Sequence, residues 1–99
     1  MSFDFSDAWF LTALILIGKE STLKQIVQTG DAINHAIMTQ AEIDRALLKL
    51  IPTGYIVATS KNTFIATEKS AEISECSAFK RAGLFSMVDV VLKRLNSVK

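Results

Sequence analysis

The first third of the chain opens with an almost unbroken apolar segment. From Ala8 to Gly18 nearly every side of a helix would be apolar, which is typical of a helix that is central in its fold or pressed against a partner. Ser6 is the expected N-cap, with Asp7 in the first turn at the positive end of the helix dipole. Gly18 is expected to end the helix. The run holds about eleven residues, roughly half of a membrane span, and therefore predicts a buried helix.

A second helical pattern begins with a capping box, in which a side chain at the helix start and one three residues later bond to each other's backbone N–H groups. Thr22 and Gln25 form this box. Apolar residues keep helical spacing as far as Ile37, with Gly30 between them. We expect the helix to break or kink at Gly30, because Gly30 suits a helix end and Asp31 suits the cap of a new helix.

The third pattern is the most regular helix in the chain. Thr39 and Glu42 form its capping box. Pro52 stops it, because proline cannot continue a helix and restricts the residue before it. The residues expected on its buried face are Ile43, Ala46, Leu47, Leu50 and Ile51.

A hairpin and a further helix are expected next. The β-prone runs 55–59 and 63–67 flank the short polar turn 60–62, and this pattern predicts two paired strands. Thr67 is then expected to cap a helix that fades near Arg81.

The last pattern completes one domain. Ser86 and Asp89 form a further capping box that is expected to open an amphipathic C-terminal helix. The expected fold is α+β and mostly helical, and residues 1–99 form a single domain. Residues 6–67 hold the first helices and a two-stranded hairpin, and residues 68–99 hold the C-terminal helices.

The order of elements and the local sequence resemble the winged helix-turn-helix superfamily. Residues 39–50 and 54–56 resemble the recognition helix and the first wing strand of its bacterial regulators, and residues 64–69 resemble the second wing strand and the helix after it. Residues 31–37 and 80–85 are similar to a group of small, largely uncharacterised bacterial winged-helix proteins. The wider resemblance implies a DNA-binding transcription regulator, and the narrower one implies the fold and the bacterial cytoplasm but supplies no activity.

The resemblance also implies which residues would meet DNA. The third helix would lie in the major groove, with the hairpin beside it. Arg45 is suited to guanine and Gln40 to adenine or to phosphate, and Lys61 at the hairpin tip would approach the backbone or the minor groove. The residues expected to contact DNA are Gln40, Asp44, Arg45, Leu48, Lys49 and Lys61.

Charge leaves a second interpretation open. The net charge is +1, which excludes a strongly basic nucleic-acid binder but not a locally basic one. Phosphates would repel Asp44, and Leu48 offers nothing to DNA. The same surface would suit a winged-helix module that binds another protein. A ligand-sensing regulator with a pocket between two copies is a third interpretation.

Apolar content predicts a second copy of the chain. Hydrophobic residues make up 49% of the sequence, which is more than a small domain hides easily. The first helix is apolar nearly all round, and Val90 widens the apolar face of the last helix. We therefore expect a homodimer built from the first and last helices.

Residue types argue against catalysis and metal binding. The chain has one cysteine, Cys76, and one histidine, His35, so neither an internal disulfide nor a metal site is expected. Carboxylates around Cys76 disfavour a reactive thiolate, and His35 is expected in a local hydrogen-bonded turn. No nucleophile–base set or phosphate-binding glycine loop is present, so we expect no enzyme and no cofactor. An acidic N-terminus with Asp4 argues against a signal peptide and favours the cytoplasm.

Overall fold

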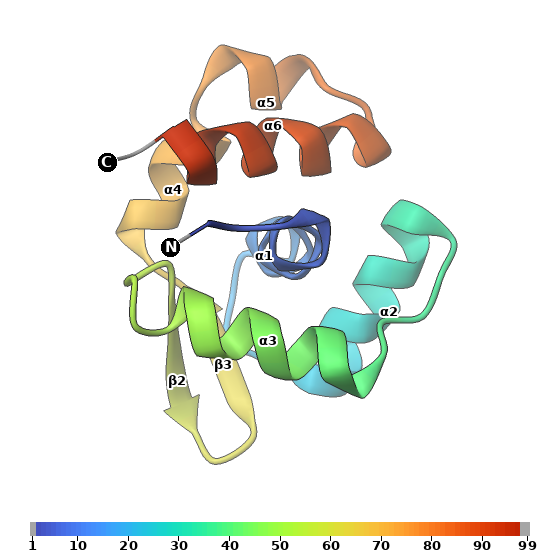
Figure 1. The fold of residues 1–99 in the computed structure, drawn as a ribbon, viewed down its shortest axis with the longest axis vertical. Helices are drawn as coiled ribbons and strands as arrows, with labels where there is room; N and C mark the ends of the chain where they lie inside the picture. Colours follow the sequence, from blue (N-terminus) through green and yellow to red (C-terminus); the bar gives the residue numbers. More distant parts are fainter. Residues whose placement is uncertain (1, 98–99) are drawn as a thin grey trace.

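A computed structural model describes residues 2–97 and shows helices arranged around one central helix, with a small antiparallel sheet at one side (Figure 1). The fold is α+β and mostly helical, as predicted. The helices are α1 (Phe5–Ile17), α2 (Leu23–Asn34), α3 (Gln40–Leu50), α4 (Glu68–Ser74), α5 (Ser77–Arg81) and α6 (Leu84–Ser97). The strands are β1 (Ser21–Thr22), β2 (Ile56–Ser60) and β3 (Thr63–Ala66).

Helix α1 is the core of the molecule. Residues 6–14 are all buried, because α2, α3 and α6 pack around them and β3 lies near the C-terminal end of the helix. The prediction of a central helix is confirmed. The prediction that the first helix pairs with a second copy is wrong for this stretch, since elements of the same chain already cover it.

The N-terminus of α1 differs from the prediction. The N-cap is Asp4, whose carboxylate accepts a hydrogen bond from the Asp7 backbone N–H, while the Asp7 carboxylate accepts one from the Asp4 N–H. Ser6 lies inside the first turn, and its hydroxyl donates to Asp4 Oδ1 at 2.8 Å. Two aspartates three residues apart therefore form the capping box, and the helix begins earlier than Ser6 would allow. Gly18 ends the helix at a left-handed φ of 74°, as predicted.

Helix α2 begins at the predicted Thr22–Gln25 box and runs through Gly30 without the expected break. Gly30 is buried, and its carbonyl accepts a hydrogen bond from Trp9 Nε1 at 2.9 Å. A Cβ at this position would lie 3.2 Å from Trp9 Nε1 and 2.6 Å from Met38 Cε. Glycine is therefore favoured here by close packing and not by a helix end. The helix stops instead at His35, which has a positive φ of 53°.

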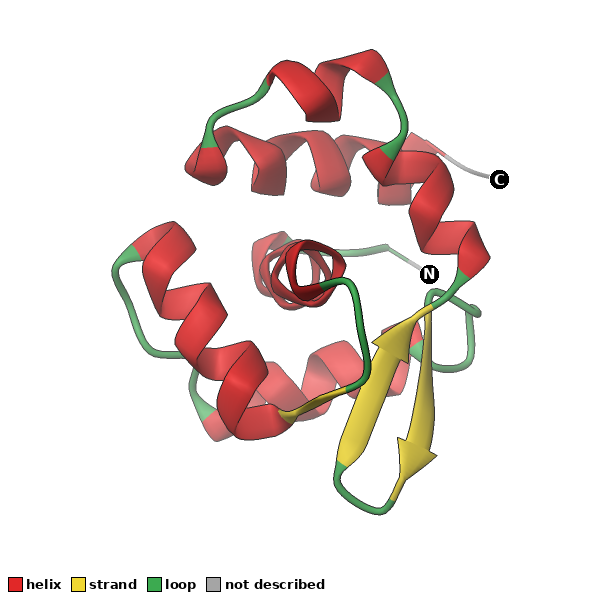
Figure 2. Ribbon diagram, turned by 180° about the vertical axis from the view of Figure 1, so that it is seen from behind, coloured by secondary structure: helices red, strands yellow, loops and turns green. Residues whose placement is uncertain are grey.

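Helix α3 begins at the Thr39–Glu42 box, and the turn that contains Pro52 follows it, as predicted. The expected hairpin is present as β2 and β3. The sheet has three strands in the order β1-β3-β2 and not two (Figure 2). The missed strand, β1, pairs Ser21 with Phe64, and it is too short to show an alternating pattern in the sequence.

The C-terminal part contains more breaks than predicted. Two short helices, α4 and α5, replace the single helix expected after Thr67. Thr67 is at the N-cap of α4, but its hydroxyl donates to the Gly54 carbonyl at 2.6 Å instead of capping. The predicted box of Ser86 and Asp89 is wrong, because α6 already begins at Leu84 and both residues lie inside it.

Candidate functional site

Helix α3 and the β2–β3 hairpin lie on the side of the molecule opposite α5 and α6 (Figure 1). The inward residues of α3, Ile43, Ala46 and Leu50, are buried, and the helix packs on α1. The α3 outward face is defined here as Gln40, Ala41, Asp44, Arg45 and Leu48, all of which are exposed. Its exposure follows from the amphipathic spacing of the helix, since the buried positions recur every three to four residues.

Two polar residues of the α3 outward face are bonded to each other. Gln40 Nε2 donates to Asp44 Oδ1 at 2.9 Å across one helical turn. Asp44, which has no evident role in the sequence pattern, therefore orients the Gln40 amide. Within residues 2–97 the only ion pairs join Lys49 to Asp4 and Asp7, so the guanidinium of Arg45 forms none there.

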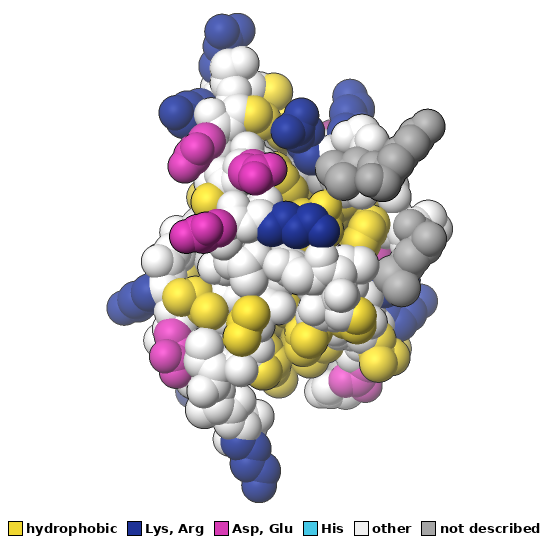
Figure 3. All heavy atoms as spheres, turned by 90° about the vertical axis from the view of Figure 1, so that its left-hand side faces the viewer, with side chains coloured by type: hydrophobic (Ala, Val, Ile, Leu, Met, Phe, Trp, Pro, Cys, Tyr) yellow, Lys and Arg dark blue, Asp and Glu magenta, His cyan; other side chains and the backbone are white. Residues whose placement is uncertain are grey.

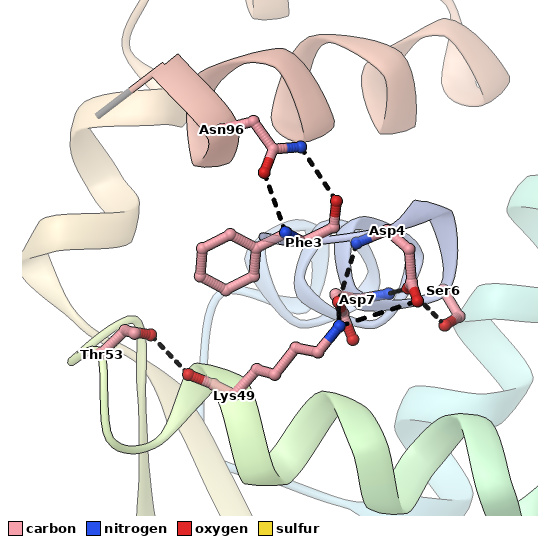
Figure 4. Close-up of polar contacts among 7 residues, drawn as sticks. All are labelled: Phe3, Asp4, Ser6, Asp7, Lys49, Thr53 and Asn96. Atoms are coloured by element: carbon pink, nitrogen blue, oxygen red, sulfur yellow. Dashed lines mark hydrogen bonds and ion pairs between the residues drawn. The ribbon is translucent and has the colours of Figure 1, made fainter. Parts of the chain in front are cut away.

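The sequence predicted that Lys49 would be exposed on the outward face, but the structure places it elsewhere. Its ammonium lies 2.9 Å from Asp7 Oδ2 and 3.7 Å from Asp4 Oδ2, with the side chain 25% exposed (Figure 4). The hydrogen bond to Asp7 raises the pKa of Lys49 above 10.5, against the lowering effect of burial. The sequence holds one signal for this partner, because Asp7 is a charged residue next to a long apolar run and a buried charge requires a counter-charge.

The hairpin tip is polar and carries the exposed Lys61. The Thr63 hydroxyl shares hydrogen bonds with Thr59 at 2.8 Å and Ser60 at 2.6 Å, and it donates to Glu20 at 2.8 Å. The pairing of β2 with β3 is irregular between Ala58 and Ser60. These bonds fix the tip beside the start of β1 and leave the lysine as its projecting cation.

On the face drawn in Figure 3, basic side chains lie at several separate places instead of in one patch. In Figure 3 they occur at the top, in the middle and at the lower end, where Figure 1 places the hairpin tip, and acidic side chains lie among them. Apolar residues are exposed on the same side as α3, and Leu48 is 73% exposed. The α3 side therefore combines the exposed cations Arg45 and Lys61 with the exposed Leu48.

One uncharged groove lies elsewhere, between the end of α1, β3 and α4. It encloses about 220 Å³ and is lined by Ile15, Gly18, Ile65, Ala66, Thr67, Ala71 and Ser74. The hydroxyls of Thr67 and Ser74 already donate to backbone carbonyls. Among residues 2–97 no group of three or more potential metal ligands is found, and no helix is long and apolar enough to cross a membrane.

Comparison with known proteins adds no assignment, since no family model, curated protein or solved structure matches this chain. Any functional conclusion must therefore come from the residues and the geometry described above.

Proposed function

We propose that this chain is a winged helix-turn-helix protein that binds double-stranded DNA and regulates transcription. The observation that carries the proposal is the joint exposure of the α3 outward face and the hairpin tip on one side of the molecule. Helices α1 to α3 followed by a hairpin correspond in order to a recognition helix with its wing. The sequence motifs of residues 39–50 and 64–69 support the same interpretation.

In this proposal α3 enters the major groove. Arg45 donates to O6 and N7 of guanine, the commonest specific contact to a base. Asp44 and Gln40 act as a pair, in which the Gln40 carbonyl oxygen and the second Asp44 oxygen accept from the amino groups of adenine or cytosine. Lys61 on the hairpin neutralises a backbone phosphate. Lys49 is left out of the contact set, because its ammonium is already paired.

A single copy would bind weakly. Arg45, Lys61 and the exposed Lys24 supply three cations, for which log K is expected to fall with log salt at a slope of about −2.7. Two copies would double that slope and the area of contact. Leu84 and Phe85 at the start of α6 are 51% and 52% exposed, and a homodimer formed through this end of α6 would cover them.

The test is the fluorescence anisotropy of a labelled generic duplex across a series of salt concentrations. Linear weakening with log salt, and a flatter slope in Arg45→Ala and Lys61→Ala, supports the proposal. Lys80→Ala is the matched control, because this exposed cation lies on α5, on the opposite side of the molecule. Absence of binding at low salt would contradict the proposal.

The exposed Leu48 supports a second candidate function, in which the α3 outward face binds a protein. An apolar side chain 73% exposed contributes little to phosphate contacts but suits the buried centre of a protein interface. Leu48→Asp separates the two functions, since it would abolish a protein contact and would weaken DNA binding only through its added negative charge. Ala41→Glu adds the same charge at an exposed position of this face without removing the leucine, and it is the matched control.

A further inference from the structure

Asp7 and Lys49 join the start of α1 to the last turn of α3 across 42 positions of sequence. We call this contact the Asp7–Lys49 clamp. Asp7 is fully buried, at 0% exposure, whereas the Lys49 side chain is 25% exposed. The clamp is therefore a contact between a buried carboxylate and an ammonium that reaches it from the surface (Figure 4).

Lys49 is the cation that compensates the buried Asp7 carboxylate. Asp7 Oδ2 accepts from the Asp4 backbone N–H at 2.9 Å and from Lys49 Nζ at 2.9 Å. Asp7 Oδ1 is buried and has no hydrogen-bond partner among residues 2–97. Lys49 is the only cation paired with Asp7 there. Removing one partner of a buried ion pair leaves a charge without compensation, which is far more costly than losing a surface pair.

The clamp belongs to a connected set of contacts between α6 and the turn that follows α3 (Figure 4). Asn96 of α6 accepts from the Phe3 N–H at 2.8 Å and donates to the Phe3 carbonyl at 2.9 Å, which holds the segment just before α1. At the other end the Thr53 hydroxyl donates to the Lys49 carbonyl at 2.6 Å. Lys49 also follows Arg45 by one turn of the same helix, so the orientation of α3 that the clamp holds is also the orientation of the helix that carries Arg45.

We infer that Asp7 is a positioning residue that orients α3 for DNA through Lys49 and keeps the Lys49 ammonium away from phosphate. This inference rests on the proposed function. The physical reason is that a phosphate contact by Lys49 would leave the buried Asp7 carboxylate without its cation. The energy of such an uncompensated charge corresponds to a change of about 10²- to 10³-fold in an equilibrium constant, which is more than one phosphate contact supplies.

The first arm of the test measures the salt slope of DNA binding. Asp7→Asn is neutral, keeps the shape of the side chain and leaves the ammonium only its longer contact to Asp4 at 3.7 Å, so the slope steepens by up to about 0.9, the value of one added phosphate contact. Asp89→Asn on α6 changes the net charge equally without releasing Lys49, and its slope stays that of the native chain. The double variant D7N/K49M also keeps the native slope, because neither chain uses Lys49 on phosphate.

The second arm measures unfolding in urea and needs no DNA. Lys49→Met raises the unfolding equilibrium constant by about 10²- to 10³-fold, and D7N/K49M recovers most of that loss. Lys49→Arg preserves stability and the native DNA affinity, since it keeps a cation opposite Asp7 and its planar fork offers several N–H donors to a carboxylate. If Lys49 only filled space, Lys49→Met would lower stability by the same amount in the native chain and in the Asp7→Asn background.

The outcomes separate the two proposals. A D7N/K49M slope flatter by about 0.9 than that of the native chain would mean that Lys49 contacts phosphate, and it would overturn the inference. Native stability of Lys49→Met would overturn it as well. If the native chain binds no DNA, the proposed function and the DNA half of the inference both fail, whereas the urea cycle still decides whether the clamp exists.

Discussion

The buried part of α1 and the outward face of α3 contain the same kinds of residue, but these residues have different roles in the two helices. Both carry a leucine and an aspartate, but Leu14 and Asp7 are fully buried, whereas Leu48 and Asp44 are exposed. The α1 aspartate needs a cation from another helix, while the α3 aspartate is satisfied by Gln40 one turn away. Burial therefore decides whether a residue of this chain holds the fold together or remains available for a partner.

The largest expected effect is the difference in stability between alanine substitutions at Leu14 and at Leu48. Leu14→Ala removes a fully buried side chain of α1 and is expected to destabilise the protein by about 2–5 kcal/mol. Leu48→Ala on α3 is expected to change stability by less than about 0.5 kcal/mol. Urea denaturation of the two variants measures both values. Similar losses at the two positions would show that α3 is covered in solution by a partner.

Replacing a buried glycine and an exposed glycine by alanine compares the effect of one added methyl group in the two environments. Gly30→Ala would push Cβ against Trp9 and Met38, and overpacking of this kind costs about 1–3 kcal/mol. Because the end of Met38 can move, we expect a value near the lower bound. Gly83→Ala meets no atom within 4 Å and is expected to be neutral or slightly stabilising. Thermal unfolding tests both, and a stabilised Gly30→Ala would contradict the packing role of Gly30.

The capping box of α3 is expected to have a moderate effect. The Thr39 hydroxyl accepts from the Glu42 N–H at 3.1 Å, and loss of such a cap costs about 0.5–2 kcal/mol. Thr39→Ala therefore lowers stability by this amount and Thr39→Ser restores most of it. The measurement is the midpoint of urea unfolding. An unchanged midpoint in Thr39→Ala would show that packing on α1 alone fixes the start of α3.

The smallest expected effect is the pH dependence of the contacts around the clamp. Burial alone would raise the pKa of Asp4, but hydrogen bonds from Ser6 and the Asp7 N–H, with the charge of Lys49, lower it below 3.8. The stability that Asp4 adds is therefore present above pH 3.8 and is lost as the pH falls through its folded pKa. The pKa of Lys49 is raised above 10.5, so its contribution is present below that pH and is lost as the pH rises further.

Melting temperatures measured from pH 2 to pH 12 would show both losses of stability, as an acidic limb and an alkaline limb of the curve of melting temperature against pH. Asp4→Asn should flatten the acidic limb and leave the alkaline limb in place. An acidic limb unchanged by this substitution would contradict the assignment to Asp4.

Local signals in the sequence predicted most of the fold. The structure confirms the capping boxes at Thr22 and Thr39, the helix end at Gly18 and the hairpin. These features could be predicted because each depends on residues within a few positions of one another. The helix end expected at Gly30 is absent, and β1, which the sequence did not predict, adds a third strand to the predicted hairpin. Both depend on contacts with distant residues, Trp9 for Gly30 and β3 for β1.

The candidate site follows the same division. Exposure of Asp44, Arg45 and Leu48 follows from helical spacing and was predicted. The placement of Lys49 was not, because its partner Asp7 lies 42 positions earlier and no periodicity connects them. What the site binds remains a prediction, since the same exposed residues suit DNA or a protein.

The most direct test of the central claim is amide NMR of the labelled protein during titration with a duplex. The account predicts that chemical shift changes gather in residues 40–48 and 57–63, with residues 77–97 unaffected except at a dimer contact near the start of α6. Shift changes centred on α5 and α6, or none at low salt, would contradict the claim that α3 and the hairpin form the DNA-binding surface.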